Sequence, residues 1–169
     1  PLHESRKGLV VAMDLEQYSY EPGNKEKIRA TEGTILSRIP PRVKIRENAS
    51  LEMPHIMILI DDRDKILIEP LCNKTENLNK IYDFDLMQNG GHIRGWQIKA
   101  GTNVANEIEN SIAIIESKER FDSLYGLSDS KPVYYAVGDG NHSLASAKEC
   151  YNLTKNPYAK YAMVEIENI

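Results

Sequence analysis

The sequence predicts an α+β fold, with helices packed on a mixed sheet, in a single domain over residues 1–169. Short apolar runs of strand length recur along the chain, and stretches with apolar residues at helical spacing lie between them. The two kinds intermix without the strict strand–helix–strand repeat of a fully parallel sheet, so the sheet is expected to be mixed. The length suits one well-buried domain. Because the first residue is Pro1, we expect a fragment of a longer chain.

The amino-terminal part predicts two strands with short helices between them. Residues 8–13 form an apolar run of strand length, and residues 55–60 form another. The apolar spacing over 35–39 suggests a short helix, which Pro40-Pro41 ends. Because proline fits the first turn of a helix, a second helix is expected to start there and run through Arg46.

The carboxyl-terminal part predicts a hairpin, two helices and two further strands. Two extended runs, 80–87 and 92–98, flank Asn89-Gly90-Gly91, which favours a hairpin. Residues 104–125 carry apolar residues at helical spacing with charges between them, and should form the longest amphipathic helix. The remaining elements are a strand over 132–137, a helix over 144–153 and a strand over 161–166.

Composition limits the kinds of binding partner and metal site that the protein is expected to have. The net charge of −4 and pI near 5.6 disfavour a nucleic acid or an anionic membrane as partner. No apolar run approaches the roughly 20 residues that span a bilayer, and a cytoplasmic location is expected. Cys72 and Cys150 lie far apart, which favours two buried, reduced thiols. No zinc-ligand spacing occurs among the histidines and cysteines.

The segment Gly138-Asp139-Gly140-Asn141-His142-Ser143, here called the 138–143 turn, is the first candidate site. Its glycines allow positive φ and close approach of a ligand. Ser143 can cap the helix that follows, and the free N–H groups and positive end of that helix favour a phosphate. Asp139 can hold a metal ion, and His142 can act as an acid or base. The structural alternative is a tight turn in which glycine supplies geometry and Asn and Asp supply local caps.

A second candidate is the basic stretch that includes Arg29, Arg38, Arg42 and Arg46. Arg42 and Arg46 are four residues apart and should share one face of a helix begun at Pro40. A planar guanidinium group suits phosphate. The alternative is a solvated basic helix face paired with nearby glutamates.

Six motifs, spread in order over nearly the whole chain, resemble one protein family. They cover residues 6–14, 28–34, 38–42, 82–87, 90–93 and 138–143. The family is the bacterial and archaeal domain-of-unknown-function family numbered one thousand and fifteen. Its members are larger than this chain, so the resemblance also implies a fragment.

The resemblance implies a fold and a type of site. The family is grouped with the ParB/sulfiredoxin-like superfamily, which includes kinases that phosphorylate free serine from a nucleotide donor. It therefore implies a nucleotide-phosphate site at the last strand-to-helix turn. In many members this turn reads Asp-Gly-His-His-Arg; here Asp139, Gly140 and His142 match, and Asn141 and Ser143 replace the first His and the Arg. The missing Arg removes a bidentate phosphate ligand, which indicates altered specificity.

From the motifs and the resemblance together we expect a small-molecule kinase or phosphotransferase that uses a nucleotide, ATP or ADP, with Mg²⁺. The 138–143 turn would cradle phosphates, Arg29 and Arg42 would add positive charge, and Asp139 would help to recruit Mg²⁺. Glu32 is the expected base for the acceptor hydroxyl, and His142 a further acid/base group. The alternative is a non-catalytic nucleotide-binding or protein-interaction module. The expected partner of the enzyme is a small-molecule substrate.

Overall fold

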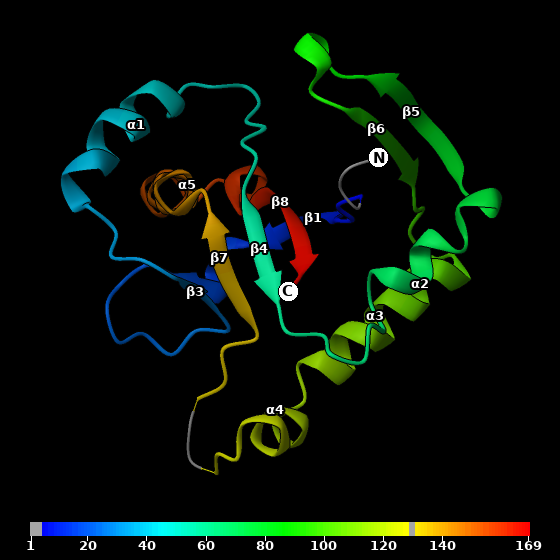
Figure 1. Ribbon diagram of the computed structural model, residues 1–169. Helices are drawn as coiled ribbons and strands as arrows, with labels where there is room; N and C mark the ends of the chain where they lie inside the picture. The colour runs from blue at the N-terminus through cyan, green and yellow to red at the C-terminus, as the bar shows by residue number, and fades with distance from the viewer. Residues whose placement is uncertain (1–4, 129–130) are drawn as a thin grey trace.

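A computed structural model describes residues 5–128 and 131–169 of the chain, and its centre is a six-stranded sheet (Figure 1). The strand order is β1-β8-β4-β7-β3-β2, and a separate two-stranded sheet pairs β5 with β6. The strands of the main sheet are β1 Leu9–Asp14, β2 Tyr18–Ser19, β3 Ile28–Ala30, β4 Met57–Ile60, β7 Tyr135–Asp139 and β8 Tyr161–Asn168. The hairpin strands are β5 Asn79–Asp85 and β6 His92–Gln97.

Five α-helices and five short 3-10 turns complete the described elements. The helices are α1 Ile39–Arg46, α2 Glu69–Cys72, α3 Asn103–Ile115, α4 Lys118–Tyr125 and α5 Asn141–Thr154. The 3-10 turns are η1 Leu15–Gln17, η2 Leu36–Arg38, η3 Thr75–Asn77, η4 Met87–Asn89 and η5 Pro157–Ala159. The α+β class predicted from the sequence is confirmed.

The sheet is mixed, as the sequence predicts. β2, β3 and β7 run parallel, β4 is antiparallel to β7 and parallel to β8, and β1 is antiparallel to β8. The carboxyl ends of β3 and β7 therefore meet at the same edge of the sheet as the amino end of β4 (Figure 1). Loops that are far apart in the sequence are brought together at this edge.

The core lies between α5 and one face of the sheet. Along β8 the alternate residues Ala162, Val164 and Ile166 are buried, because successive side chains of a strand point to opposite faces. Leu144 and Tyr151 of α5 belong to the same buried cluster. A second cluster joins Ile39 and Val43 of α1 to Ala145 of α5. The order of layers is thus α1, α5, sheet, and Figure 1 shows α5 between α1 and the strands.

The prediction of one long helix over residues 104–125 is wrong. The chain forms two helices there, because the Ser117 hydroxyl accepts the Arg120 N–H at 3.2 Å and so caps the start of α4. The longest helix of the described residues is α5, with 14 residues against 13 in α3. The helical spacing of apolar residues continues through this break. The cap at Ser117 is therefore what divides the segment into two helices.

The expected pair of buried thiols is also wrong in part. Cys72 is exposed and Cys150 is half-buried, and both are free cysteines. Cys72 ends the four-residue helix α2, and its thiol lies 3.8 Å from the Ile68 carbonyl oxygen.

The β5–β6 hairpin is confirmed, but its apolar residues do not join the core. All seven residues of β5 are exposed. Tyr82 stacks over Gly95, where a Cβ would overlap its ring, and Phe84 lies opposite Ile93. On the other face His92 bridges Asp83 and Asp85. The hairpin is therefore amphipathic, and its apolar side faces solvent.

Candidate functional site

The 138–143 turn joins the end of β7 to the start of α5 through Gly140. Gly140 is the residue before the helix and has φ of 87°, in the left-handed region that favours glycine. A Cβ at this position would lie 3.1 Å from Ile56 Cγ1 and 3.2 Å from Ile56 Cα. Backbone conformation and close packing on Ile56 both require glycine here.

No side chain caps the first turn of α5 within the described part of the chain. Asp139 Oδ1 accepts the Gly140 N–H at 2.7 Å, but the cap residue itself has no side chain. The first N–H groups of a helix have no partner inside the helix, and with the helix dipole they favour an anion. Ser143 is the third residue of α5, so the expectation that Ser143 caps this helix is wrong.

The loop after β3 lies directly against the turn. The Thr31 hydroxyl donates to the Val137 carbonyl oxygen at 2.6 Å, and the Ile35 N–H donates to His142 Nε2 at 3.1 Å. The motifs 28–34 and 138–143, which are about a hundred residues apart, therefore meet at one sheet edge. Glu32 lies in this loop and is exposed. Because His142 accepts at Nε2, its ring proton lies on Nδ1 in this arrangement.

Two polar side-chain atoms near this edge are buried without a hydrogen-bond partner among the described residues. They are Asn141 Oδ1 and Thr34 Oγ1. Asn141 is only 4% exposed, and its amide nitrogen makes a long contact of 3.5 Å with the Val137 carbonyl oxygen. Buried polar groups are normally paired, and an unpaired one calls for a partner such as an ordered water, an ion or a ligand.

The arginines lie at different distances along the sheet from the turn. Arg42 and Arg46 share α1, as predicted. Arg46 Nη1 donates to the Ser143 carbonyl oxygen at 2.8 Å, so its guanidinium lies beside the first turn of α5. Arg42 is exposed and donates to the Arg38 carbonyl oxygen of the preceding turn. The predicted basic stretch included Arg46, although only Arg29 and Arg42 were expected at the turn itself. Arg46 Nε also lies 3.5 Å from Glu52 Oε1.

Arg29 is at the opposite end of β7 from the turn. Its Nη2 donates to the carbonyl oxygens of Lys131 and Pro132, at 3.2 and 3.1 Å, and its Nε donates to the Glu26 carbonyl oxygen. These residues precede β7, whereas the turn follows it. Arg29 holds two chain segments together there and is not among the residues that the structure brings to the turn.

Asp139 is the acidic residue of the turn itself, exposed at the end of β7. Among the described residues no group of three or more His, Cys, Asp and Glu side chains has metal-binding geometry. Mg²⁺ often uses only one or two carboxylates and takes its other ligands from substrate phosphates and water. Asp139 alone could therefore hold Mg²⁺ only if the other ligands came from water or from a bound molecule.

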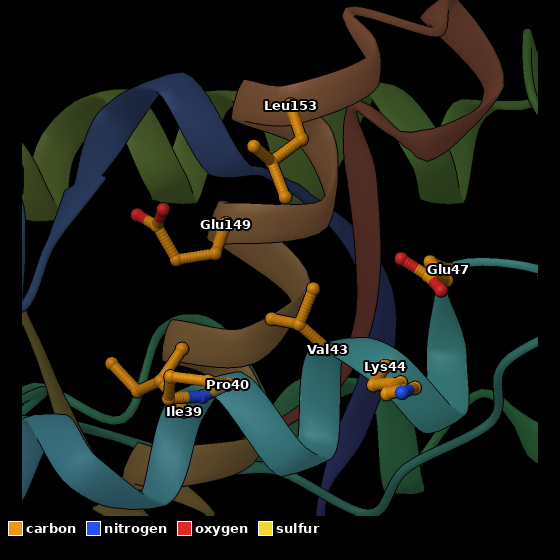
Figure 2. Close-up of a pocket in the computed structure, with 7 residues that line it drawn as sticks. All are labelled: Ile39, Pro40, Val43, Lys44, Glu47, Glu149 and Leu153. Atoms are coloured by element: carbon orange, nitrogen blue, oxygen red, sulfur yellow. The ribbon is translucent and has the colours of Figure 1, made fainter.

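An open groove of about 290 Å³ lies between α1 and α5 (Figure 2). Its lining consists of Ile39, Pro40, Val43, Lys44, Glu47, Glu149 and Leu153. Glu149 accepts a hydrogen bond of 2.7 Å from Tyr20, and burial raises the pKa of this tyrosine to about 12. The groove lies on the second half of α5, about 12 Å along the helix from Asn141, so it is separate from the 138–143 turn.

Comparison with known proteins gives a family and no further relatives. The family described as "Protein of unknown function (DUF1015)" matches residues 2–169. No curated protein and no solved structure matches the chain. In the described residues no helix is long and apolar enough to cross a membrane.

Proposed function

We propose that this chain, which belongs to the DUF1015 family, binds a nucleotide through its phosphates at the 138–143 turn and transfers a phosphoryl group to a small molecule. The observation that carries the proposal is the meeting of two motifs at one sheet edge: the uncapped start of α5 and the 28–34 loop, joined through Thr31 and His142. The unpaired Asn141 Oδ1 adds support.

Magnitudes indicate how the phosphate would be held. A helix N-terminus stabilises an anion by about 0.3–2 kcal/mol, whereas a Kd of 1 mM needs about 4 kcal/mol. The helix alone is therefore insufficient. A hydrogen bond to a charged group adds about 1.5–3 kcal/mol. Arg46, beside Ser143, would supply it in exchange for its ion pair with Glu52. The phosphates alone should then bind in about the millimolar range, with tighter binding depending on the rest of the nucleotide.

The transfer itself needs positioning and neutralisation of charge. The acceptor hydroxyl oxygen forms a bond to the terminal phosphorus, the bond from that phosphorus to the bridging oxygen breaks, and the shortened nucleotide leaves with the electron pair. Asp139 would hold Mg²⁺, which neutralises phosphate charge when it is bound. Glu32, exposed at the same edge, is the base that the sequence nominates for the hydroxyl proton.

Isothermal titration with ATP and ADP, with and without Mg²⁺, tests the binding, and nucleoside diphosphate release in the presence of a panel of hydroxyl-bearing acceptors tests the transfer. The matched variants are Arg46→Gln beside the turn and Arg29→Gln at the far end of β7. Arg46→Gln should weaken ATP binding about tenfold, and Arg29→Gln should leave it within twofold. An equal effect of the two variants, or no binding by the wild type, would exclude the phosphate site.

The second candidate is a non-catalytic nucleotide-binding or protein-interaction module. The exposed apolar side of the β5–β6 hairpin, with Phe84 at 52% and Tyr82 at 38% exposure, favours a role in protein interaction. ATP binding without turnover on any acceptor would select this module.

A further inference from the structure

The segment that carries His55 packs against the 138–143 turn through Ile56, although 83 to 88 residues separate His55 from the turn in the sequence. It precedes Ile56, the residue against which Gly140 packs, and β4 begins at Met57. Met57 pairs with Asp139 on one side and with Glu165 on the other. Asp139, Met57 and Glu165 thus form a row across three neighbouring strands at the edge where the turn lies.

His55 and Glu165 form a hydrogen-bonded pair. His55 Nε2 lies 2.6 Å from Glu165 Oε2, and the Glu165 N–H donates to the Ile56 carbonyl oxygen at 2.8 Å. The Glu165 side chain is 15% exposed, whereas the His55 side chain is 60% exposed. The carboxylate is therefore sheltered, whereas most of the imidazole that it holds is exposed.

The position of Glu165 is itself fixed by two neighbours. Arg6 Nη2 lies 3.0 Å from Glu165 Oε2, and Arg6 Nε lies 3.3 Å from Glu167 Oε1. A Cβ on Gly8 would overlap the Glu165 carboxylate, so the glycine makes room for it. A carboxylate held in this way can orient a histidine, as the third member of a catalytic triad does.

The other two described histidines are engaged differently. His142 accepts the Ile35 N–H at Nε2, so Nδ1 carries its proton, and both ring nitrogens of His92 lie within 2.7 Å of a carboxylate oxygen. With Nε2–H donated to Glu165, His55 keeps a lone pair on Nδ1. Of these three, His55 is the histidine prepared to take a proton.

We infer that His55, oriented by Glu165, is the acid/base group of the site at the 138–143 turn and takes the proton of the acceptor hydroxyl in place of Glu32. The inference rests on the proposed function and adds the residue that activates the acceptor. The hydroxyl proton moves to His55 Nδ1 while the oxygen bonds to phosphorus and the nucleoside diphosphate leaves with the electron pair. Glu165 balances the charge of the imidazolium and does not itself touch the acceptor.

Chemical modification tests the pair without any nucleotide. Diethyl pyrocarbonate acylates a free imidazole lone pair, and at about pH 8 a histidine with the ordinary pKa is largely neutral. Peptide mass spectrometry on the full chain should show that His55 reacts several-fold faster than His92 and His142. Glu165→Gln should slow the reaction at His55, whereas Asp83→Asn, which alters a carboxylate partner of His92, should leave the rate at His55 unchanged. A His55 rate equal to that of His92, or unaffected by Glu165→Gln, overturns the inference.

Turnover and nucleotide affinity test the role. His55→Gln should lower turnover about 10²- to 10⁴-fold, the usual contribution of a general base, and leave the Kd for ATP within twofold. His92→Gln is the matched control and should keep wild-type turnover. Turnover kept by His55→Gln but lost by Glu32→Gln would assign the proton to Glu32 and overturn the inference. If the wild type neither binds nor turns over ATP, the proposed function fails, and the modification rates alone decide whether the His55–Glu165 pair is reactive.

Discussion

Single residues at the 138–143 turn perform different tasks although they are adjacent in the sequence. Gly140 supplies a backbone conformation, Asp139 holds the Gly140 N–H, and His142 joins the turn to the loop after β3. These tasks separate residues that should affect stability from those that should affect binding.

Gly140→Ala should destabilise the fold. The change adds strain at φ of 87° and places a methyl group 3.1 Å from Ile56, so we expect a loss of about 1–3 kcal/mol. Gly33→Ala is the matched control, because a Cβ there meets no atom of the described chain within 4 Å. Urea unfolding of both variants provides the measurement. Equal midpoints for the two variants would show that Gly140 carries no such constraint.

His142→Ala should lower the affinity for ATP at least tenfold while costing about 1 kcal/mol of stability, the usual value of one hydrogen bond. The lost bond is the one from the Ile35 N–H, which also positions the 28–34 loop. His142→Gln, which can accept this N–H, should keep the stability. Titration with ATP beside a urea melt measures both effects. An unchanged affinity with a large fall in the midpoint would show a purely structural histidine.

Among the elements, the β5–β6 hairpin contains charged hydrogen bonds that shift the pKa of its side chains. His92 lies between Asp85 and Asp83, and these hydrogen bonds raise the pKa of His92 above its ordinary value. The bonds to Lys80 and to His92 lower the pKa of Asp83. On one face of the hairpin, near its turn, charged hydrogen bonds therefore join the two strands. The other face is apolar and exposed.

The raised pKa gives the hairpin a pH dependence. Since protonated His92 is favoured in the folded state, its stabilising effect is complete below about pH 6.5, the ordinary histidine pKa, and is lost as pH rises through the higher folded value. An NMR titration of the His92 ring should give a midpoint above 6.5. Asp85→Asn should lower that midpoint, because the hydrogen bond to Asp85 is the largest cause of the raised pKa of His92. A midpoint at or below 6.5 in the wild type would show that the hydrogen bonds of His92 to Asp83 and Asp85 do not raise its pKa.

At the scale of the whole molecule, the strand order indicates which strands the stability of the fold depends on. β8 lies between β1 and β4, so the last strand of the chain pairs with the first. It supplies Ala162, Val164 and Ile166 to the core and Glu165 to the outer face. The hairpin, in contrast, pairs only within itself among the described strands.

Removal of the hairpin should therefore spare the fold, whereas loss of β8 should not. Asn79 and Gln97 are paired across the hairpin, so a short Gly-Ser link between them replaces residues 80–96 with little distortion. The free energy of unfolding should change by about 1 kcal/mol or less, since loop closure costs little. A chain that ends at Lys160 should show no cooperative transition. Urea melts followed by circular dichroism compare the two, and similar damage from both would contradict this division.

The sequence by itself determined most elements and the place of the candidate turn. Apolar runs and turn residues predicted β1, β4, the hairpin, β7 and β8, and the motifs predicted the family. These features depend on local periodicity and backbone preference, which a sequence carries directly. The break at Ser117 and the start of α5 at Asn141 were missed, because a cap depends on which N–H group the side chain meets.

Only the tertiary structure decided which residues share the site. The parallel pairing of β3 with β7 and the antiparallel pairing of β4 with β7 bring Glu32, His55 and His142 to one edge. The same register directs Arg29 to the other end of β7, and the packing of α1 on α5 places Arg46 beside the turn. Strand order and register arise from long-range packing of the whole core, and the spacing of residues along the chain does not encode them locally.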